Sequence, residues 1–563
     1  MKKLLYALFL LPSLLFCEIF FTPFLKHDIK HHHTAHQSDS PHFKGLILIG
    51  NREDLNPSGY ENVQGVMSYN ATYPGSIVAL KKRVRPYFER SLDHHTIMEI
   101  KDTVFAYYQD HNQPAVTITI PKQDISDGVL QLVVTEQKLG QVTCKGNTYF
   151  SSERIESAIK LEPGETIASD VLNQNLYWLN RNPFREVNAV YVPGKDGQTD
   201  IELLCKDRFP LRLYLGIDNT GNDVTGNNRL YSGVDIGNLF WSDQRLSYQF
   251  ITSSDFKKLR AHTLYYELPL PWQHMLNIYG GYSRVDAEFS SFGLEEDQFR
   301  THGFSVQASM RYDIPLKPKR HLLHEVIWGF DFKRTNNNLS LGGIPVISED
   351  NVNLTQAMMG YNLGYEIKAL TFSWEIEGFY SPGSWISDQT NEDYESLRPY
   401  AKNQYVYLRT ALAASWRFYN QWTLSNIFRG QLASVNLLPS EEYGVGGYNT
   451  VRGYKERLVN GDNVFIWNLE LQTPTFSILN PLAGWKKFRD SMQFLVFFDY
   501  GLCGVNKTAP MQEKTEYLMS IGPGVRYTVI PYVSFRADWG FQLHNLHLGD
   551  PNRRLDFALT VGY

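Results

Sequence analysis

The chain has 563 residues and a formal net charge of -5, which gives no indication of a nucleic-acid partner. Aromatic residues make up 14% of it, yet the mean hydropathy is only -0.33. After residue 17 no run of about 18 apolar residues recurs, which excludes a helical membrane protein. Two classes are left: a membrane β-barrel whose strands alternate apolar and polar residues, or a large secreted β-sandwich or β-helix protein.

Residues 1 to 17 have the pattern of a secretory signal peptide. Lys2 and Lys3 precede an apolar run from Leu4 to Phe16, which is too short to span a bilayer as a helix. Cleavage after Cys17 fits this pattern. Lipidation of Cys17 is the weaker alternative, because bulky Phe16 stands where lipoprotein signals carry a small residue.

Residues 18 to 42 form a polar segment rich in histidine. Its histidines are His27, His31, His32, His33, His36 and His42. A metal-binding tract is one interpretation, but no framework of Cys or carboxylate ligands accompanies the histidines. We therefore expect a flexible linker and no metal site.

From residue 43 to about residue 206, short strands alternate with amphipathic helices. Apolar residues in 80–113 recur at intervals of three and four, which predicts two helices, and the alternating stretches at 115–121 and 128–136 predict two strands. A second series follows between residues 139 and 207, with a helix that starts after serine caps at 151 and another that starts at Ser169. The pattern predicts two modules in series, each with the order strand, helix, helix, strand, strand.

Two cysteines fall in the second module. Cys144 and Cys205 could form a disulfide, which an exported compartment would permit, and two buried free thiols are an equally good interpretation. Cys503 has no evident partner in the sequence.

Beyond Pro210 the helical period disappears and a period of two continues to the last residue. The final nine residues place one set of apolar side chains on a single face: Leu555, Phe557, Leu559, Val561 and Tyr563. A sandwich gives little reason for the last residue to be an aromatic that completes the apolar face. With about 10 residues per membrane strand plus turns and loops, residues 211 to 563 hold about sixteen strands, and an even number closes the sheet without a free edge.

Two short motifs lie within the predicted barrel. The first consists of Val451, Arg452, Gly453 and Tyr454, and the second contains Phe497, Asp499 and Gly501. In this order they resemble the signature motifs of the BamA-like outer-membrane superfamily. Residues 437–456, 218–230 and 120–142 are similar to corresponding regions of the two-partner secretion transporters, the FhaC/ShlB/HecB-like group.

The resemblance implies a domain organisation of α+β POTRA domains followed by a transmembrane antiparallel β-barrel. Residues 43–138 would form the first POTRA domain, 139–208 the second, and 209–563 the barrel. Members of this group often carry a helix that plugs the pore on a long linker. Only residues 18–42 separate the expected cleavage site from Phe43, so we do not expect a full plug helix.

The resemblance also implies a function. We expect a transporter in the outer membrane of a diderm bacterium, with POTRA domains in the periplasm that recognise an unfolded exoprotein and a pore that passes it to the cell surface. Its partners would be that secreted polypeptide, outer-membrane lipid and the barrel assembly machinery, which would use the terminal aromatic Tyr563. The alternatives are an insertase that assembles other barrels and a passive porin.

Arg452 and Asp499 are expected to form an ion pair inside the barrel. Asp499 alternates with Phe497 and Gly501 on one strand face, and the resemblance implies that this face points inward. A guanidinium suits this place because its planar fork can bond a carboxylate through two donors. The sequence shows no catalytic motif, so we expect neither an enzyme nor a cofactor.

Overall fold

The computed structural model describes residues 40–563 apart from 112, 114–115, 196–197, 223–224, 291–297, 320, 338–346, 481–488 and 547–550. The predicted signal peptide and nearly all of the predicted linker therefore lie outside the described residues, as would any plug helix. Among the residues described, no helix is both long and apolar enough to cross a membrane.

The first α+β unit contains a four-stranded sheet with two α-helices. Its elements are β1 (Gly45–Ile49), η1 (Arg52–Asp54), β2 (Gly65–Tyr69), α3 (Ile77–Val84), η2 (Arg85–Tyr87), α4 (His94–Asp110), β3 (Val116–Thr119) and β4 (Val129–Glu136). The strand order is β2-β1-β4-β3, and β1 pairs in parallel with both neighbours. Strand β2, which the sequence pattern did not predict, is an additional edge strand.

The second α+β unit has the predicted order of one strand, two helices and two strands. Its elements are β5 (Leu139–Lys145), α5 (Ser152–Ser157), α6 (Ser169–Leu179), β6 (Arg185–Pro193) and β7 (Thr199–Asp207). The sheet order is β5-β7-β6. The Ser151 side chain caps α5 by accepting a hydrogen bond from the Arg154 backbone N–H. Apolar side chains of both helices and all three strands form one buried core.

Cys144 and Cys205 are free thiols in the structure, so the disulfide interpretation of this pair is wrong. Strand register gives the reason, because Cys144 on β5 lies opposite Leu203 rather than Cys205 on β7. Burial raises the pKa of the Cys144 thiol to about 11 and also raises that of Cys205.

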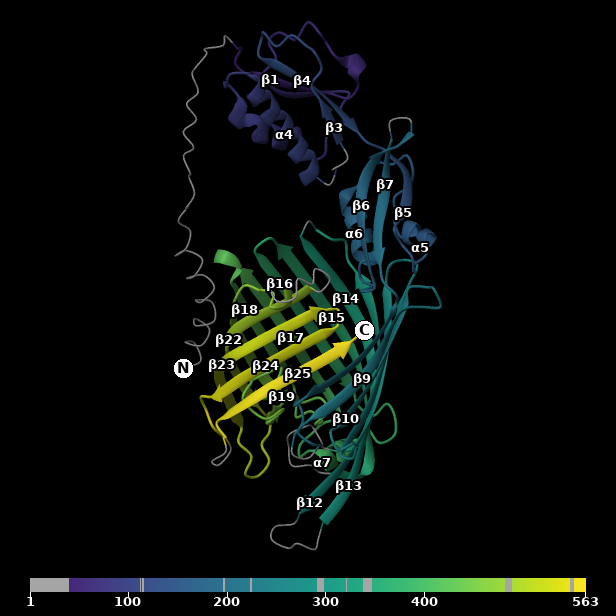
Figure 1. The fold of residues 1–563 in the computed structure, drawn as a ribbon, viewed down its shortest axis with the longest axis vertical. Helices are drawn as coiled ribbons and strands as arrows, with labels where there is room; N and C mark the ends of the chain where they lie inside the picture. The colour runs from purple at the N-terminus through teal and green to yellow at the C-terminus, as the bar shows by residue number, and fades with distance from the viewer. Residues whose placement is uncertain are drawn as a thin grey trace. The chain divides into compact units, whose positions relative to one another are not determined.

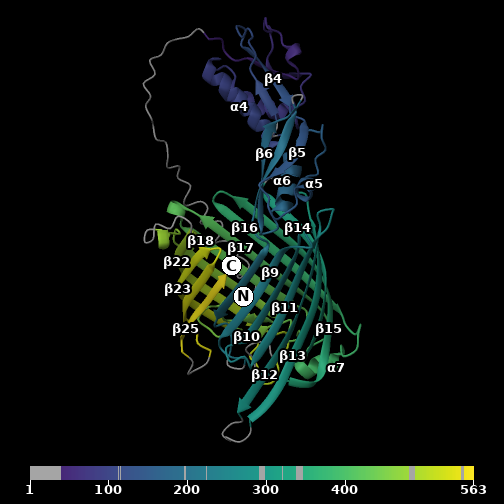
Figure 2. The same cartoon turned by 45° about the vertical axis from the view of Figure 1, so that its right-hand side comes forward.

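The rest of the chain forms a closed antiparallel barrel of sixteen strands in its described part, which confirms the predicted fold class (Figure 1). The strands are β8 (Leu211–Asp218), β9 (Arg229–Leu239), β10 (Gln244–Ser253), β11 (Leu259–Pro269), β12 (Met275–Ser290), β13 (Gln298–Pro315), β14 (Leu322–Asn337), β15 (Ile347–Ile367), β16 (Leu370–Pro382), β17 (Gln404–Arg417), β18 (Thr423–Ala433), β21 (Asn463–Gln472), β22 (Arg489–Gly504), β23 (Thr515–Ile530), β24 (Val533–Gln542) and β25 (Arg553–Gly562). Each strand pairs with its sequence neighbour in the ring, and β25 returns to β8. Figure 2 shows the strands β9 to β15 side by side on one wall.

The period of two in the sequence separates the two faces of this barrel. On β25, Leu555 and Val561 are about half exposed on the outer face, whereas Asp556 between them in sequence is 1% exposed. The same contrast separates Trp539 from Asp538 on β24. Apolar side chains therefore point to the lipid, and carboxylates are buried inside the lumen.

Two long connections lie at the end of the barrel far from the second α+β unit. The first, residues 383–403, joins β16 to β17, contains α7 (Asn391–Leu397) and is called the cap segment below. The second, residues 434–462, joins β18 to β21 and is called the long loop; it contains the small hairpin of β19 (Tyr443–Val445) and β20 (Val459–Gly461). The VRGY motif lies in the long loop.

The free thiols lead to a prediction about chemical reactivity. We expect Cys144 and Cys205 to react slowly with iodoacetamide at pH 7, because their raised pKa values keep both thiols protonated. Both should react faster as the pH rises, and Cys144 should do so as the pH approaches 11. Mass spectrometry of the labelled peptides measures this. A cross-linked pair of peptides that appears only without reductant would contradict the structure.

Candidate functional site

The tip of the long loop is held inside the barrel by Arg452. Its side chain is 3% exposed and its guanidinium makes two bonds to Asp499 on β22, from Nε to Oδ2 and from Nη2 to Oδ1, each of 2.7 Å. The Arg452 backbone N–H also donates to Asp499 Oδ2 at 3.1 Å. Nη1 donates to Glu470 Oε1 at 2.5 Å. The structure thus brings together the two residues that the sequence predicted as an ion pair.

The second motif shapes the wall that receives this arginine. Phe497 and Gly501 lie on the same face of β22 as Asp499, and the Arg452 Cζ lies 3.7 Å from the centroid of the Phe497 ring. A Cβ atom at Gly501 would lie 2.4 Å from Val445 Cγ1 and 2.8 Å from Val451 Cγ2. The phenyl ring therefore stacks on the guanidinium, while the glycine leaves room for the valines of the loop.

The remaining residues of the first motif contact β23, β24 and β25. Val451 is buried in an apolar cluster between the loop and the wall. The Gly453 N–H donates to Asp556 Oδ2 at 3.1 Å, and Gly453 O accepts from Gln542 Nε2 at 2.7 Å. The Tyr454 hydroxyl donates to the carbonyl of Met519 at 2.9 Å. The whole motif is thus bonded to the wall.

A further arginine contacts the tip from another strand of the same wall. Arg536 on β24 donates from Nη2 to the carbonyl of Tyr448 at 2.8 Å, and its Cζ lies 3.8 Å from the centroid of the Tyr448 ring. Arg536 also pairs with Asp538 at 2.6 Å, and Asp538 pairs with Arg526 at 2.8 Å. The described side chains Arg536, Asp538 and Arg526 thus form a chain of alternating cations and carboxylate beside the tip, in which Asp538 is paired on both sides.

The base of the long loop has ion pairs of its own, which the sequence reasoning missed. Arg398 of the cap segment donates from Nη1 to Asp462 Oδ1 at 2.6 Å and from Nη2 to Asp462 Oδ2 at 3.1 Å. Lys333 on β14 lies 2.6 Å from Glu441 Oε1, and the Glu441 side chain is fully buried. The sequence did contain a signal for the helix of the cap segment: Thr390 and Asp393 have the spacing of a capping box, and they form one at the start of α7.

Tyr563, predicted to serve in barrel assembly, lies at the end of β25 beside β8. The residue is 83% exposed, while its N–H donates to Leu213 O at 2.9 Å and its carbonyl accepts from Leu213 N at 3.1 Å. Its role in assembly stays a prediction, as do the roles of the two motifs in transport. Among the described residues, no group of three or more His, Cys, Asp or Glu could hold a metal ion.

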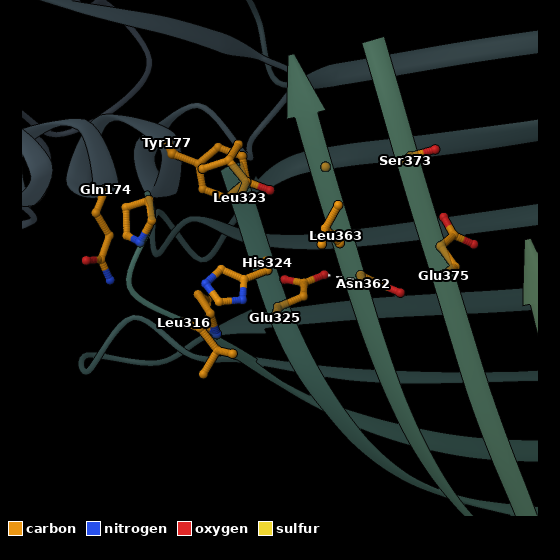
Figure 3. A pocket seen from close by; sticks show the side chains of 13 residues that line it. Gln174, Tyr177, Leu316, Leu323, His324, Glu325, Asn362, Leu363, Ser373 and Glu375 are labelled. Atoms are coloured by element: carbon orange, nitrogen blue, oxygen red, sulfur yellow. Dashed lines mark hydrogen bonds between the residues drawn. The ribbon is translucent and has the colours of Figure 1, made fainter. Parts of the chain in front are cut away.

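The rim nearest the second α+β unit contains a pocket of about 170 Å³ between α6 and the ends of β14, β15 and β16 (Figure 3). Gln174 and Tyr177 approach it from α6, and Glu325 lies on its barrel side. Glu325 accepts hydrogen bonds from Arg181 Nη2 at 2.6 Å and from Asn362 Nδ2 at 3.2 Å. The α+β unit is therefore bonded to the barrel wall at this rim.

A second set of contacts joins the same unit to β9 and the turn that follows it. Arg185 Nη1 donates to Asp243 Oδ1 at 2.5 Å, and Asn182 Nδ2 donates to the carbonyl of Gly237 at 2.7 Å. The Asn238 side chain donates in return to the carbonyl of Tyr149 at 2.9 Å. The unit is thus bonded to the barrel at β14 and also at β9 and the turn after it.

Comparison with known families gives two matches. A family model described as "Haemolysin secretion/activation protein ShlB/FhaC/HecB" matches residues 197–527, which is more than half of the chain. A model described as "POTRA domain, ShlB-type" matches residues 74–137, within the first α+β unit. That the second α+β unit is also a POTRA domain stays a prediction.

Curated relatives and solved structures agree with these matches. The chain is 24% identical over 412 residues to an outer membrane transporter CdiB of Dickeya dadantii, which covers 71% of this chain and 69% of the relative. It is 20% identical over 470 residues to a heme/hemopexin transporter protein HuxB of Haemophilus influenzae, covering 78% and 76%. The solved structure of CdiB from Escherichia coli has the same fold, with a TM-score of 0.72 at 16% identity and coverage of 95% and 93%.

The Arg452–Asp499 pair leads to a prediction about loop mobility. Asp499→Ala removes the main partner of a buried guanidinium, and breaking such a pair costs about 3–5 kcal/mol. We expect the backbone amides of residues 446–456 to exchange with deuterium at least ten-fold faster. Hydrogen-exchange mass spectrometry of the full chain in detergent measures this.

Asp490→Ala provides the matched control on the same strand. Asp490 accepts from the backbone N–H groups of Ile478 and Leu479 at the other end of β22, so its loss should leave the loop tip protected. Equal exchange rates in the loop for wild type and Asp499→Ala would mean that the ion pair does not hold the tip.

The close approach of loop and wall backbones leads to a second prediction. A Cβ atom at Gly540 would lie 2.5 Å from the Cα of Gly453, and backbone cannot move aside as a flexible side chain can. We expect Gly540→Ala to displace the tip and to speed exchange in residues 446–456. Gly378→Ala on β16 is the control, since its Cβ would meet only Met359 O at 3.8 Å. Full protection of the loop in Gly540→Ala would contradict the packing described here.

Proposed function

The chain belongs to the haemolysin secretion/activation family of ShlB, FhaC and HecB, and on this premise we propose that it binds one unfolded secreted protein through its α+β units and exports it through the barrel. The family consists of outer-membrane transporters that work in two-partner secretion. The chain accordingly lies in the outer membrane, with its POTRA region in the periplasm. What we propose beyond this is that the cargo is one unfolded secreted protein and that the α+β units recognise it.

The observation that carries this proposal is the set of ion pairs and hydrogen bonds that hold the tip of the long loop against the barrel wall. Arg452 is fixed by carboxylates of β21 and β22, in a lumen lined by further charged residues. Such bonds can be exchanged for bonds to water or to a polypeptide backbone, so the polar contacts of the tip can be replaced when the loop leaves the wall. The loop is therefore suited to leave its place and to return as a hydrated, extended chain passes.

The open edges of the two α+β sheets supply a means of capture. Strand β2 of the first unit and strand β6 of the second are edge strands, and both carry exposed apolar side chains such as Met67 and Tyr191. An extended polypeptide can pair with an edge strand through backbone hydrogen bonds that do not depend on its sequence. The exposed side chains would add a preference for apolar residues at alternate positions.

Energy for export would come from outside the cell. The outer membrane has no ATP, and the sequence contains no Walker loop. We propose that folding of the emerging cargo at the surface prevents its return, so that diffusion through the lumen becomes directional.

Depletion of this protein in its native bacterium tests the proposal. Quantitative mass spectrometry of the surface, outer-membrane and periplasmic fractions should show that one or a few secreted proteins fall at least ten-fold at the surface. Other barrel proteins should stay at their normal level. Expression of Asp490→Ala should restore export, whereas Asp499→Ala should restore it in part or not at all, because the loop tip loses its position.

Two other results would contradict this function. A general loss of barrel proteins from the outer membrane would point to an insertase, which assembles other barrels. An unchanged surface proteome, together with lower permeability to small solutes, would point to a passive porin.

A further inference from the structure

The seam where the barrel closes is paired by strands along only part of its length. β8 and β25 pair from Asp218 and Ala558 to Tyr214 and Gly562, which is five positions, whereas β24 and β25 pair at nine. Among the residues that the structure describes, those of β25 from Arg553 to Phe557 therefore have a strand neighbour on one side only. This stretch is the half of the seam that lies near the outer loops.

The side chain of Asn219 continues the row of hydrogen bonds between β8 and β25 into the outer half of the seam. Its backbone N–H donates to Phe557 O at 3.3 Å, its Nδ2 donates to Leu555 O at 2.6 Å, and its Oδ1 accepts from Phe557 N at 2.9 Å. A carboxamide offers the same donor and acceptor as a peptide group. The Asn219 side chain thus takes the place of a further strand residue and closes one additional rung.

The backbone carbonyl of Asn219 does not join the ladder and connects the seam to the loop tip instead. It accepts a hydrogen bond from Arg554 Nη2. Arg554 Nε donates to Asp556 Oδ1 at 2.9 Å, and Asp556 Oδ2 accepts the Gly453 N–H at 3.1 Å. Gly453 follows Arg452 in the chain. Three hydrogen bonds therefore connect Asn219 at the seam to the motif of residues 451–454.

A pocket of about 320 Å³ lies beside this path, lined among others by Asn219, Gly453, Tyr454 and Arg554. The side chains of the path therefore border open space on one side, which leaves room for them to rearrange. The Asp556 carboxylate itself is 1% exposed, so it needs both Arg554 and the loop to remain paired. A change at either end of the path alters the partners of this carboxylate.

We propose that Asn219 is a positioning residue that couples the outer half of the barrel seam to the tip of the long loop. Release of the tip removes a partner of Asp556, frees Arg554 and loosens the rung at Asn219. By thermodynamic linkage, loss of the rung loosens the tip by the same factor, and couplings between sites are about 5-fold or larger. This coupling concerns the conformation of the barrel and does not depend on which cargo is exported.

Hydrogen exchange of the full chain in detergent tests the coupling at both ends at once. Asn219→Leu keeps a similar volume and removes the carboxamide. We expect it to speed exchange at least five-fold in residues 553–559 and also in residues 446–456. Asn426→Leu is the matched control, because in the described part of the chain the Asn426 side chain on β18 accepts from the Trp467 side chain and from no backbone group.

The reciprocal experiment uses Arg452→Ala, which leaves the seam residues intact. It should speed exchange in residues 553–559 as well as in the loop. Faster exchange confined to the seam in Asn219→Leu, and confined to the loop in Arg452→Ala, would overturn the coupling and leave two independent contacts. Unchanged exchange at the seam in Asn219→Leu would overturn the role of Asn219 itself.

A more conservative variant keeps the test valid if Asn219→Leu does not assemble. Asn219→Asp retains the acceptor for the Phe557 N–H, loses the donor to Leu555 O and adds a negative charge. We expect an intermediate acceleration at both ends in this variant. Normal protection at both ends in Asn219→Asp, with no effect of Arg452→Ala on the seam, would overturn the proposal.

Discussion

The position of the long loop inside the lumen depends on one constraint, the burial of the Arg452 guanidinium. A charge removed from water is strongly unfavourable unless it is paired and hydrogen-bonded. Asp499 supplies two bonds to the side chain and one to the backbone, and Glu470 supplies another. The Asp499 carboxylate is itself fully buried, so it needs the loop as much as the loop needs it. Loop and wall therefore stabilise each other.

Charge complementarity alone would not hold the loop in place, because the backbone of the loop also packs directly against the backbone of the barrel wall. Gly453 has a φ of 88°, a conformation that side chains disfavour, and it packs directly on Gly540. Gly501 leaves space for the valines of the loop beside Asp499. The glycines of the two motifs thus set the distance at which the arginine reaches its partner. Removal of either the charge or the space would be expected to release the same segment.

The long loop is also connected to parts of the molecule that lie far from its tip. Arg398 joins its base to the cap segment, and Lys333 joins it to β14. At the other end, Asp556 joins Gly453 to the seam. Movement of the loop would therefore rearrange several buried ion pairs together, which is typical of an element with two discrete positions rather than a continuous range. A transporter that must pass a chain without a lasting leak would benefit from such behaviour.

The sequence by itself determined the strand-rich barrel and the pairing of the two motifs. A period of two separates lipid-facing from lumen-facing residues along each strand, and the spacing of Phe497, Asp499 and Gly501 places them on one face. Strand β2 escaped prediction because its short segment lacks a clear alternation of apolar and polar residues.

Only the tertiary structure decided which lumen charges meet, which thiols are neighbours and how the seam closes. Every inward-facing Arg, Lys, Asp or Glu gives the same signal in the sequence, so the partners of Arg398 and Lys333 follow from the registers of sixteen strands and the paths of two loops. The rung at Asn219 depends on contact with residues more than 300 positions away. Such contacts are set by closure of the barrel, which no local pattern encodes.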